Sequence, residues 1–245
     1  MDAAVLETVQ GWLRAARHVA VLTGAGISAE SGVPTFRDAQ TGYWAQFRAE
    51  DMATEEGFRA HPARVWGWYQ HRREMLAGVQ PNDGHRAPAE FALRHPGRLT
   101  LVTQNVDGLH QRAGSTDVLC LHGDLMEDRF LDLPRACCHP DTVEAGNPPH
   151  CPRCGNMLRP GVVWFGEPLP LAVFDAAQQA ARACDLMLVV GTAGAVYPAA
   201  GLAHSARAAG AKVVVVNTAP SELDDVAHAV LRGSASQVLP ALLAP

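Results

Sequence analysis

A glycine-rich turn near the N-terminus has the composition of a phosphate-binding loop. It runs Gly24-Ala25-Gly26-Ile27-Ser28 and follows an apolar run, 18–23, that predicts a buried strand. Glycines after a strand let a pyrophosphate approach the backbone, and the N-terminus of the following helix donates N–H groups to it. Because small-residue turns also serve packing alone, this turn predicts a dinucleotide site only together with other groups.

The segment that continues this turn departs from that of an ordinary dehydrogenase. A dehydrogenase carries an acidic residue about 20 residues further on, but here the chain runs Pro34-Thr35-Phe36-Arg37-Asp38. Arg37 is suited to pair with phosphate, and Phe36 to shield a reactive sugar carbon from water. We therefore expect a cover over the cofactor, with an ordinary surface loop as the alternative.

Three polar side chains, Gln104, Asn105 and Asp107, follow a second predicted strand, 99–103. Ligands of open α/β sheets bind at the carboxyl ends of the strands. Amide and carboxylate groups there suit hydroxyls and a carboxamide. Asn105 or Asp107 alone would be an ordinary helix cap, but three such residues within four positions indicate a binding site.

His122 follows a short predicted strand, 118–121, and precedes a segment of different composition. A single histidine is more often structural than catalytic. Its place at the junction between the predicted sheet and an inserted segment makes it the best candidate for a general base.

Four cysteines lie within 18 residues of one another. Cys151 and Cys154 have the spacing of half a zinc knuckle, and a tetrahedral site needs two more ligands. Local candidates are Cys137, Cys138, His139 and His150. Because successive side chains tend to diverge, we expect either a rearranged site, with Cys137 or Cys138 and with or without a histidine, or a lost metal.

The elements that must position these groups are those of an α/β protein. Apolar runs at 18–23, 99–103, 185–190 and 212–217 alternate with Ala-rich helical stretches, which predicts βαβ units and a doubly wound parallel, Rossmann-like sheet. Two segments break the rhythm: 39–82 is helical and rich in Trp, Tyr and Arg, and 123–160 carries charge, prolines and the cysteines. We expect a discontinuous NAD-binding domain and a smaller inserted domain, the latter made of a helical module and a zinc-ribbon-like module. The predicted ranges are 1–38, 83–122 and 161–245 for the first domain, and 39–82 and 123–160 for the second.

Composition narrows the class of protein. Hydrophobic residues make up 48% of the 245 and charged residues 18%, with a net charge of -5, as in soluble globular proteins. The acidity argues against nucleic acid as a partner, and the apolar run 186–203 is interrupted by Gly191, Gly194, Pro198 and Gly201, which argues against a membrane span. The first residues lack a cationic stretch, so we expect a cytoplasmic protein, and we expect a monomer.

Taken together and in order, these motifs resemble the sirtuin family over essentially the whole chain. The residues that carry the resemblance are 24–38, Gln104-Asn105-Val106-Asp107, Leu121-His122-Gly123, Val163-Trp164-Phe165-Gly166-Glu167, Gly191-Thr192 and Val216-Asn217. The resemblance implies an NAD-dependent protein-lysine deacylase, which converts acyl-lysine and NAD to lysine, nicotinamide and O-acyl-ADP-ribose, and whose partners are acyl-lysine proteins or peptides.

The resemblance also implies roles for residues. His122 would act as base on a ribose hydroxyl, Asn105 would position the ribose and water, and Asp107 with the Val106 backbone would hold the nicotinamide carboxamide. The implied cofactor-binding residues are Gly24, Ala25, Gly26, Ser28, Thr35, Phe36, Arg37, Gln104, Asn105, Val106, Asp107, Gly191, Thr192, Ala193, Asn217 and Ala235. A strand over 162–167 would pair with the peptide backbone through Val162, Val163, Trp164, Phe165 and Gly166.

Two departures from the family pattern stand out. Ala193 occupies a position where members often have Ser, which removes one hydroxyl near phosphate. The family's first cysteine pair would be expected near Phe130 and Leu133, where this chain has none. A zinc ion, bound by Cys151 and Cys154 with Cys137 and Cys138, would be structural.

Tyr69 and Arg72 resemble the pair that marks the desuccinylase branch of the family. Arg72 would pair with the carboxylate of a dicarboxylic acyl group, and Tyr69 would donate a second hydrogen bond. The alternative is an ordinary amphipathic helix face, because residues three apart are neighbours on any helix.

Three other functions remain open from the sequence. An ADP-ribosyltransferase or hydrolase would use the same pocket. A non-catalytic NAD or ADP-ribose sensor predicts a missing base, yet His122 is present. A hydride-transferring dehydrogenase is disfavoured by the absent acid and by the cover loop.

Overall fold

The computed structural model describes residues 2–34 and 47–244. Contacts divide the chain into two compact units, Met1–Thr35 with Val79–Leu121 and Leu169–Pro245, and Phe36–Gly78 with His122–Pro168. Thr35, Phe36 and Arg37, which the sequence places in a cofactor cover, lie outside the described residues.

The first unit is built on a six-stranded parallel sheet in the order β3-β2-β1-β6-β7-β8. Its strands are β1 (Val19–Thr23), β2 (Leu99–Thr103), β3 (Leu119–Cys120), β6 (Leu186–Val190), β7 (Lys212–Asn217) and β8 (Ala229–Arg232). Its helices are α1 (Ala3–Ala15), α5 (Asp83–Arg94), α6 (Leu109–Arg112), α7 (Leu171–Ala183), α8 (Gly201–Ala208) and α9 (Ala235–Leu243).

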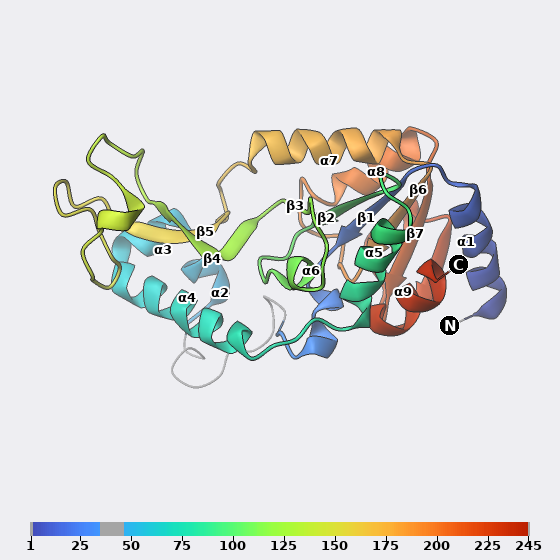
Figure 1. Cartoon of the computed structure of the whole chain (residues 1–245), viewed down its shortest axis with the longest axis horizontal. Helices are drawn as coiled ribbons and strands as arrows, with labels where there is room; N and C mark the ends of the chain where they lie inside the picture. The colour runs from blue at the N-terminus through green and yellow to red at the C-terminus, as the bar shows by residue number, and fades with distance from the viewer. Residues whose placement is uncertain (1, 35–46, 245) are drawn as a thin grey trace. The chain divides into compact units, whose positions relative to one another are not determined.

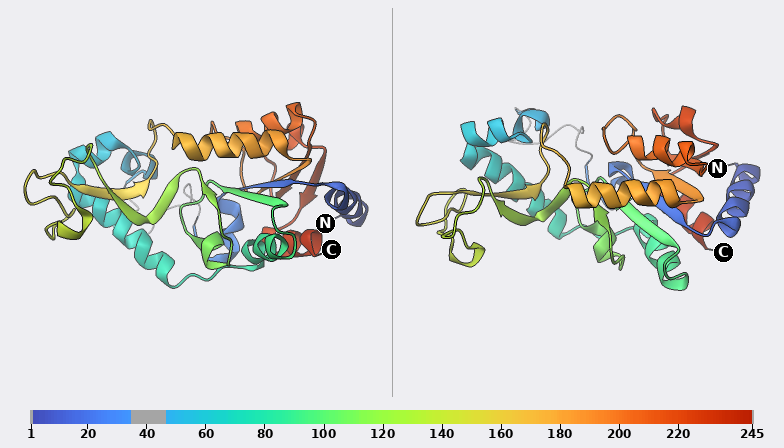
Figure 2. Two further views of the ribbon diagram at one scale, coloured as in Figure 1. Left: turned by 45° about the horizontal axis from the view of Figure 1, so that its top comes forward. Right: turned by 90° about the horizontal axis from the view of Figure 1, so that it is seen from above.

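Helices cover both faces of this sheet, which confirms the predicted doubly wound fold. Along β1, Val19 and Val21 pack with α1, α5 and α9, whereas Ala20 and Leu22 pack with α7 and α8 (Figures 1 and 2). The alternation follows from the period of two along a strand, and burial on both faces explains why the strands are apolar throughout.

Register brings the carboxyl ends of the central strands to one edge. Thr23 pairs with Thr103 on one side and with Val190 on the other, and Val190 pairs with Val216. The segments that follow these strands therefore start from the same edge, where ligands of open α/β sheets bind.

The glycine-rich turn differs from the expected strand–helix junction. It continues into two three-residue 3₁₀ helices, Ala25–Ile27 and Ala29–Ser31, separated by Ser28. The expected macrodipole of a long α-helix is therefore absent at this turn. Gly32 ends the second 3₁₀ helix with a φ of 84°, a conformation that glycine adopts without strain.

The second unit contains helices α2 (Ala49–Met52), α3 (Glu55–Ala60) and α4 (Pro62–Ala77) and an antiparallel pair, β4 (Gly123–Phe130) and β5 (Leu158–Val162). The pairing is irregular between Gly123 and Asp128. Arg73 of α4 holds this irregular stretch: it donates to the carbonyls of Leu125 (2.6 Å) and Glu127 (2.9 Å) and pairs with Asp128.

The predicted peptide-binding strand, 162–167, is wrong in its extent, because β5 ends at Val162. Gly166 has a φ of 86°, and the Glu167 carboxylate accepts from the Trp164 backbone N–H at 2.8 Å. These two features turn the chain back on itself. Within the described residues no helix is long and apolar enough to cross a membrane.

Candidate functional site

The glycine turn of the first unit packs against the turn that follows β6. Gly26 N–H donates to the Gly191 carbonyl at 2.7 Å and Gly24 N–H to the Val190 carbonyl at 2.9 Å. A Cβ on Gly24 would lie 2.8 Å from the Thr192 Cβ, and one on Gly26 would lie 2.8 Å from the Gly191 Cα. The two glycines are therefore required for the contact between these turns, as well as for any approach of a ligand.

Ser28 is the centre of a buried polar cluster behind this turn. Its hydroxyl donates to the Asp107 carboxylate at 2.7 Å and accepts from the Asn105 amide at 3.2 Å. The other Asp107 oxygen accepts from Leu109 N–H at 3.0 Å. The sequence predicted all three side chains as site residues, and the structure brings them together at the carboxyl edge of the sheet.

His85 completes the cluster from α5. The Asn82 backbone N–H donates to its Nδ1 (3.3 Å), so the hydrogen of a neutral ring lies on Nε2, which is 3.2 Å from the Ser28 hydroxyl. Burial outweighs the attraction of Asp107 and lowers the pKa of His85 to about 4. Hydrogen bonds thus run in one direction, from Asn82 through His85 and Ser28 to Asp107.

Sequence reasoning missed His85, Asn82 and a further histidine, His110. Asn82 caps α5 and binds His85 in a reciprocal arrangement that resembles a capping box with histidine in place of Glu or Gln. The Asn-x-x-His spacing before a helix was the available signal. His110 is buried, its Nε2 lies 3.0 Å from the Thr23 hydroxyl, and burial lowers its pKa to about 3.

Thr192 joins two of the predicted cofactor residues. Its hydroxyl accepts from the Gln104 amide at 3.3 Å, and its carbonyl accepts from the Asn217 amide at 3.1 Å. Ala193, where the family often has Ser, contributes its carbonyl to the Glu222 N–H at 2.9 Å. Ala235 lies buried at the first turn of α9. Side chains from after β1, β2, β6 and β7 are therefore arranged around one edge.

In the second unit, His122 is half-buried at the start of the irregular strand pair. Its carbonyl accepts from Val163 N–H at 2.8 Å, which ties the candidate base to the candidate peptide-binding segment. Phe165 N–H donates to the Ala53 carbonyl at 2.9 Å. The amides of Val163, Trp164 and Phe165 already donate within the unit, and the carbonyls of Val162 and Trp164 already accept there.

Tyr69 and Arg72 lie on α4, and Tyr69 also contacts Trp164. The indole Nε1–H of Trp164 donates to the Tyr69 hydroxyl at 2.9 Å, and Tyr69 is 4% exposed. Burial raises the pKa of Tyr69 well above its ordinary value, so the hydroxyl keeps its proton. The Arg72 guanidinium lies over the Trp68 ring, 5.1 Å from its centroid.

Arg159 and Glu167 hold Trp164 from the other side. The Arg159 guanidinium lies 3.2 Å from the centroid of the Trp164 ring and donates to both Glu167 oxygens and to the Val162 carbonyl. Burial alone would raise the pKa of Glu167, but the hydrogen bonds from Arg159 and from Trp164 N–H lower it below its ordinary value.

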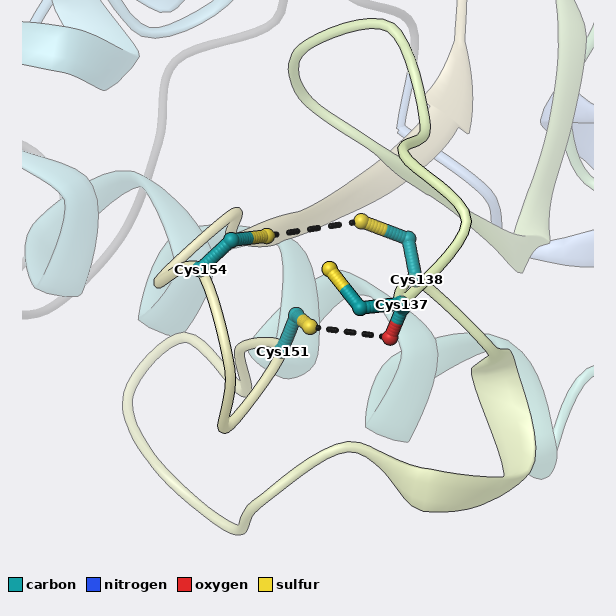
Figure 3. Close-up of side chains that lie close together, drawn as sticks. All are labelled: Cys137, Cys138, Cys151 and Cys154. Carbon is teal, nitrogen blue, oxygen red and sulfur yellow. Dashed lines mark hydrogen bonds between the residues drawn. The ribbon is translucent and has the colours of Figure 1, made fainter.

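The four predicted metal ligands come together in the second unit. The sulfur atoms of Cys137, Cys138, Cys151 and Cys154 all lie within 4.8 Å of one another, and Figure 3 shows all four side chains pointing into one space. Zn–S bonds of about 2.3 Å in a tetrahedron separate sulfurs by about 3.8 Å, so the cluster is compatible with a structural zinc ion.

The tendency of successive side chains to diverge, which made adjacent ligands unfavourable, does not separate Cys137 and Cys138. Successive side chains point to opposite sides only along an extended strand, and residues 134–139 lie outside any strand or helix. The thiols of both cysteines therefore reach the same site. A histidine ligand is therefore not needed: His139 is exposed, and His150 Nε2 lies 3.5 Å from Glu144.

Comparison with known proteins identifies the family. The model described as the Sir2 family matches residues 24–198. An NAD-dependent protein deacylase of Ralstonia nicotianae is 56% identical over 99% of this chain and 98% of its own. A solved Sir2 homolog–NAD complex is 40% identical, with a TM-score of 0.85 over 100% of this chain and 93% of that one. A Sir2 structure with a bound acetylated peptide is 29% identical, with a TM-score of 0.81 over 96% and 95%. This chain belongs to the Sir2 family.

Proposed function

We propose that this protein is an NAD-dependent protein-lysine deacylase that forms nicotinamide and O-acyl-ADP-ribose. The observation that carries the proposal is the cluster of Ser28, Asn105 and Asp107 behind the glycine turn. It supplies a fixed carboxylate and an amide at the sheet edge where α/β proteins bind nucleotides. Membership of a family whose named relatives are NAD-dependent deacylases supports the same reaction.

The residues at this edge fit NAD. Gly24 and Gly26 permit the close contact between the turns that shape this edge, and the amides of Gln104 and Asn105 suit ribose hydroxyls. Asp107, oriented by Ser28, would accept from the carboxamide N–H₂ of a bound nicotinamide. We include Ala25, Val106, Gly191, Thr192, Ala193, Asn217 and Ala235 in this proposed site, and with them the cover residues Thr35, Phe36 and Arg37.

When bound, NAD supplies the ribose carbon to which the acyl oxygen bonds as nicotinamide departs. The chain's part is to orient the reactants and to move one proton. Asn105 positions the ribose, and His122 accepts a proton from a ribose hydroxyl through its imidazole. The carbonyl of His122 is fixed by Val163 N–H, which restrains the backbone from which the imidazole projects.

For the substrate we propose acyl-lysine in an extended peptide, bound along Val162–Gly166, with a preference for succinyl or malonyl groups. Arg72 supplies a charge for the distal carboxylate, and Tyr69 supplies a protonated hydroxyl. We also propose that the protein is a cytoplasmic monomer, and its net charge of -5 is unfavourable for binding to nucleic acid.

Mass spectrometry of a succinyl-lysine peptide and its acetyl twin, with and without NAD, tests this function. We expect NAD-dependent loss of both groups, faster for succinyl, with nicotinamide and O-acyl-ADP-ribose as products. Loss of acetyl alone would contradict the assignment of Tyr69 and Arg72. ADP-ribose attached to protein without deacylation would replace the proposed reaction with ADP-ribosyl transfer.

A further inference from the structure

The hydrogen bond between Trp164 and Tyr69 bears on the chemistry of the acyl pocket, by which we mean the site that we propose Tyr69 and Arg72 form for the acyl group. In this bond the indole Nε1–H is the donor, because an indole nitrogen has no lone pair to offer. The Tyr69 hydroxyl must accept, at 2.9 Å. One of its acceptor positions is thereby filled, and its own hydrogen must point elsewhere.

Both partners of this hydrogen bond are buried, so water cannot easily replace either of them. Tyr69 is 4% exposed and Trp164 2% exposed. The raised pKa of Tyr69 keeps the hydroxyl protonated. A buried hydroxyl that already accepts is polarised by the bond and becomes a stronger donor to the next group.

The position of the indole is itself fixed by several contacts. Arg159 stacks on the ring, and its charge is balanced by Glu167, which also binds the Trp164 backbone N–H. Phe58 packs on the same indole with ring centroids 5.2 Å apart. The Nε1–H therefore cannot turn away from Tyr69 without breaking other contacts.

We propose that Trp164 is a positioning residue that orients the Tyr69 hydroxyl as a hydrogen-bond donor and so gives the acyl pocket its preference for a group ending in a carboxylate. Trp164 belongs to the segment that binds the peptide backbone and touches the helix that binds the acyl end. It thereby links the two parts of substrate recognition. This inference rests on the proposed function, and specifically on the acyl-binding role of Tyr69.

Three variants of the full-length protein test the link: Trp164→Phe, Tyr69→Phe and the double variant. Phe keeps an aromatic ring under Arg159 but removes the indole N–H. The quantity compared is the ratio of kcat/KM for the succinyl-lysine peptide to kcat/KM for its acetyl twin, which cancels losses common to both substrates. Trp66→Phe, a buried tryptophan on α4, is the matched control.

We expect each single variant to lower the ratio about fivefold, mainly through a higher KM for the succinyl peptide. The double variant should give the same ratio as Tyr69→Phe alone, because the indole acts only through the phenol. Trp66→Phe should leave the ratio near that of the parent.

The outcomes separate the inference from its premises. An unchanged ratio in Trp164→Phe, with a lowered ratio in Tyr69→Phe, would overturn the inference and leave the pocket assignment standing. Equal, additive losses from the two substitutions would overturn it as well. An unchanged ratio in Tyr69→Phe would remove the pocket assignment, and absence of any NAD-dependent deacylation would remove the proposed function itself.

Discussion

Two buried polar clusters, one in each unit, are held together in different ways. In the first unit Ser28, His85 and Asp107 form a chain of hydrogen bonds behind a strand end of a six-stranded sheet. In the second unit Arg159, a residue of β5 in the two-stranded sheet, forms an ion pair with Glu167 beside Trp164. The first cluster is positioned by parallel strands in register. The second joins β5 to residues of α3 and α4, Phe58 and Tyr69, and is held by an ion pair, aromatic contacts and hydrogen bonds.

The largest effect predicted for the second unit is on its cysteine cluster. Cys154→Ser should reduce bound zinc from about one ion per chain to near zero and lower the free energy of unfolding by several kcal/mol, because the metal stabilises a module with little core of its own. Elemental analysis and thermal unfolding measure both. Cys184→Ser, at a buried cysteine of the first unit, should keep the zinc. Full zinc content in Cys154→Ser would contradict the ligand set.

The next largest effect is on the rate of deacylation, without a change in the stability of either cluster. His122→Tyr should reduce deacylation by about 10²- to 10⁴-fold, since it removes the residue that we propose as the general base. Calorimetric titration should show ADP-ribose affinity close to that of the parent, and zinc content should be retained. Turnover near the parental rate would exclude His122 as the base.

Substitution of the charged pocket residue should change specificity more than overall activity. Arg72→Met should lower succinyl turnover relative to acetyl turnover by about 10- to 100-fold, the range for loss of a charge-assisted hydrogen bond. Competition between the two peptides in one reaction measures the ratio directly. Arg14→Met, at an exposed arginine of α1, is the control. Equal losses of turnover on the succinyl and acetyl peptides would contradict the role assigned to Arg72.

In the first unit, Ser28→Ala should weaken both stability and cofactor binding. It leaves Asp107 and His85 without a shared buried partner, which destabilises by about 1–3 kcal/mol. Denaturant unfolding and ADP-ribose titration measure the two losses. Thr8→Ala, which removes an exposed hydroxyl on α1, should have little effect. A Ser28 variant as stable as Thr8→Ala would show that the cluster is not coupled.

The last predicted effect concerns stability alone and is a pH dependence of the first unit. The pKa values of His85 and His110 fall to about 4 and about 3 in the folded state, against about 6.5 when unfolded. Between those values the unfolded chain binds more protons, so stability falls as pH is lowered from 7 toward 4. We expect a loss of about 2 kcal/mol per histidine at pH 5. Unfolding curves that do not change between pH 7 and pH 5 would contradict this.

The difference between the clusters also explains what the sequence could predict. Ser28, Asn105 and Asp107 follow predicted strands, and parallel register places strand ends together, so their proximity was predictable. His85 was missed because it acts from a helix start whose pattern lacks Glu or Gln. Cys137 and Cys138 were expected to diverge because strand geometry was assumed where the chain is irregular. β5 ends at Val162, and beyond it the Glu167 carboxylate accepts from the Trp164 N–H. The alternation of apolar and polar residues along a sequence does not predict such a contact between a side chain and the backbone.

The close contact between the turns after β1 and β6 limits how this chain can evolve. Gly191 has a φ of 61°, and a Cβ there would lie 2.4 Å from the Ile27 nitrogen, while a Cβ on Gly26 would meet the Gly191 backbone. A side chain at Gly26 or Gly191 would meet backbone atoms of the opposite turn. A second substitution in that turn changes only a side chain, so it cannot make room for the first. In a saturation library, both positions should therefore accept glycine alone, and sequence drift should be confined to the residues around them.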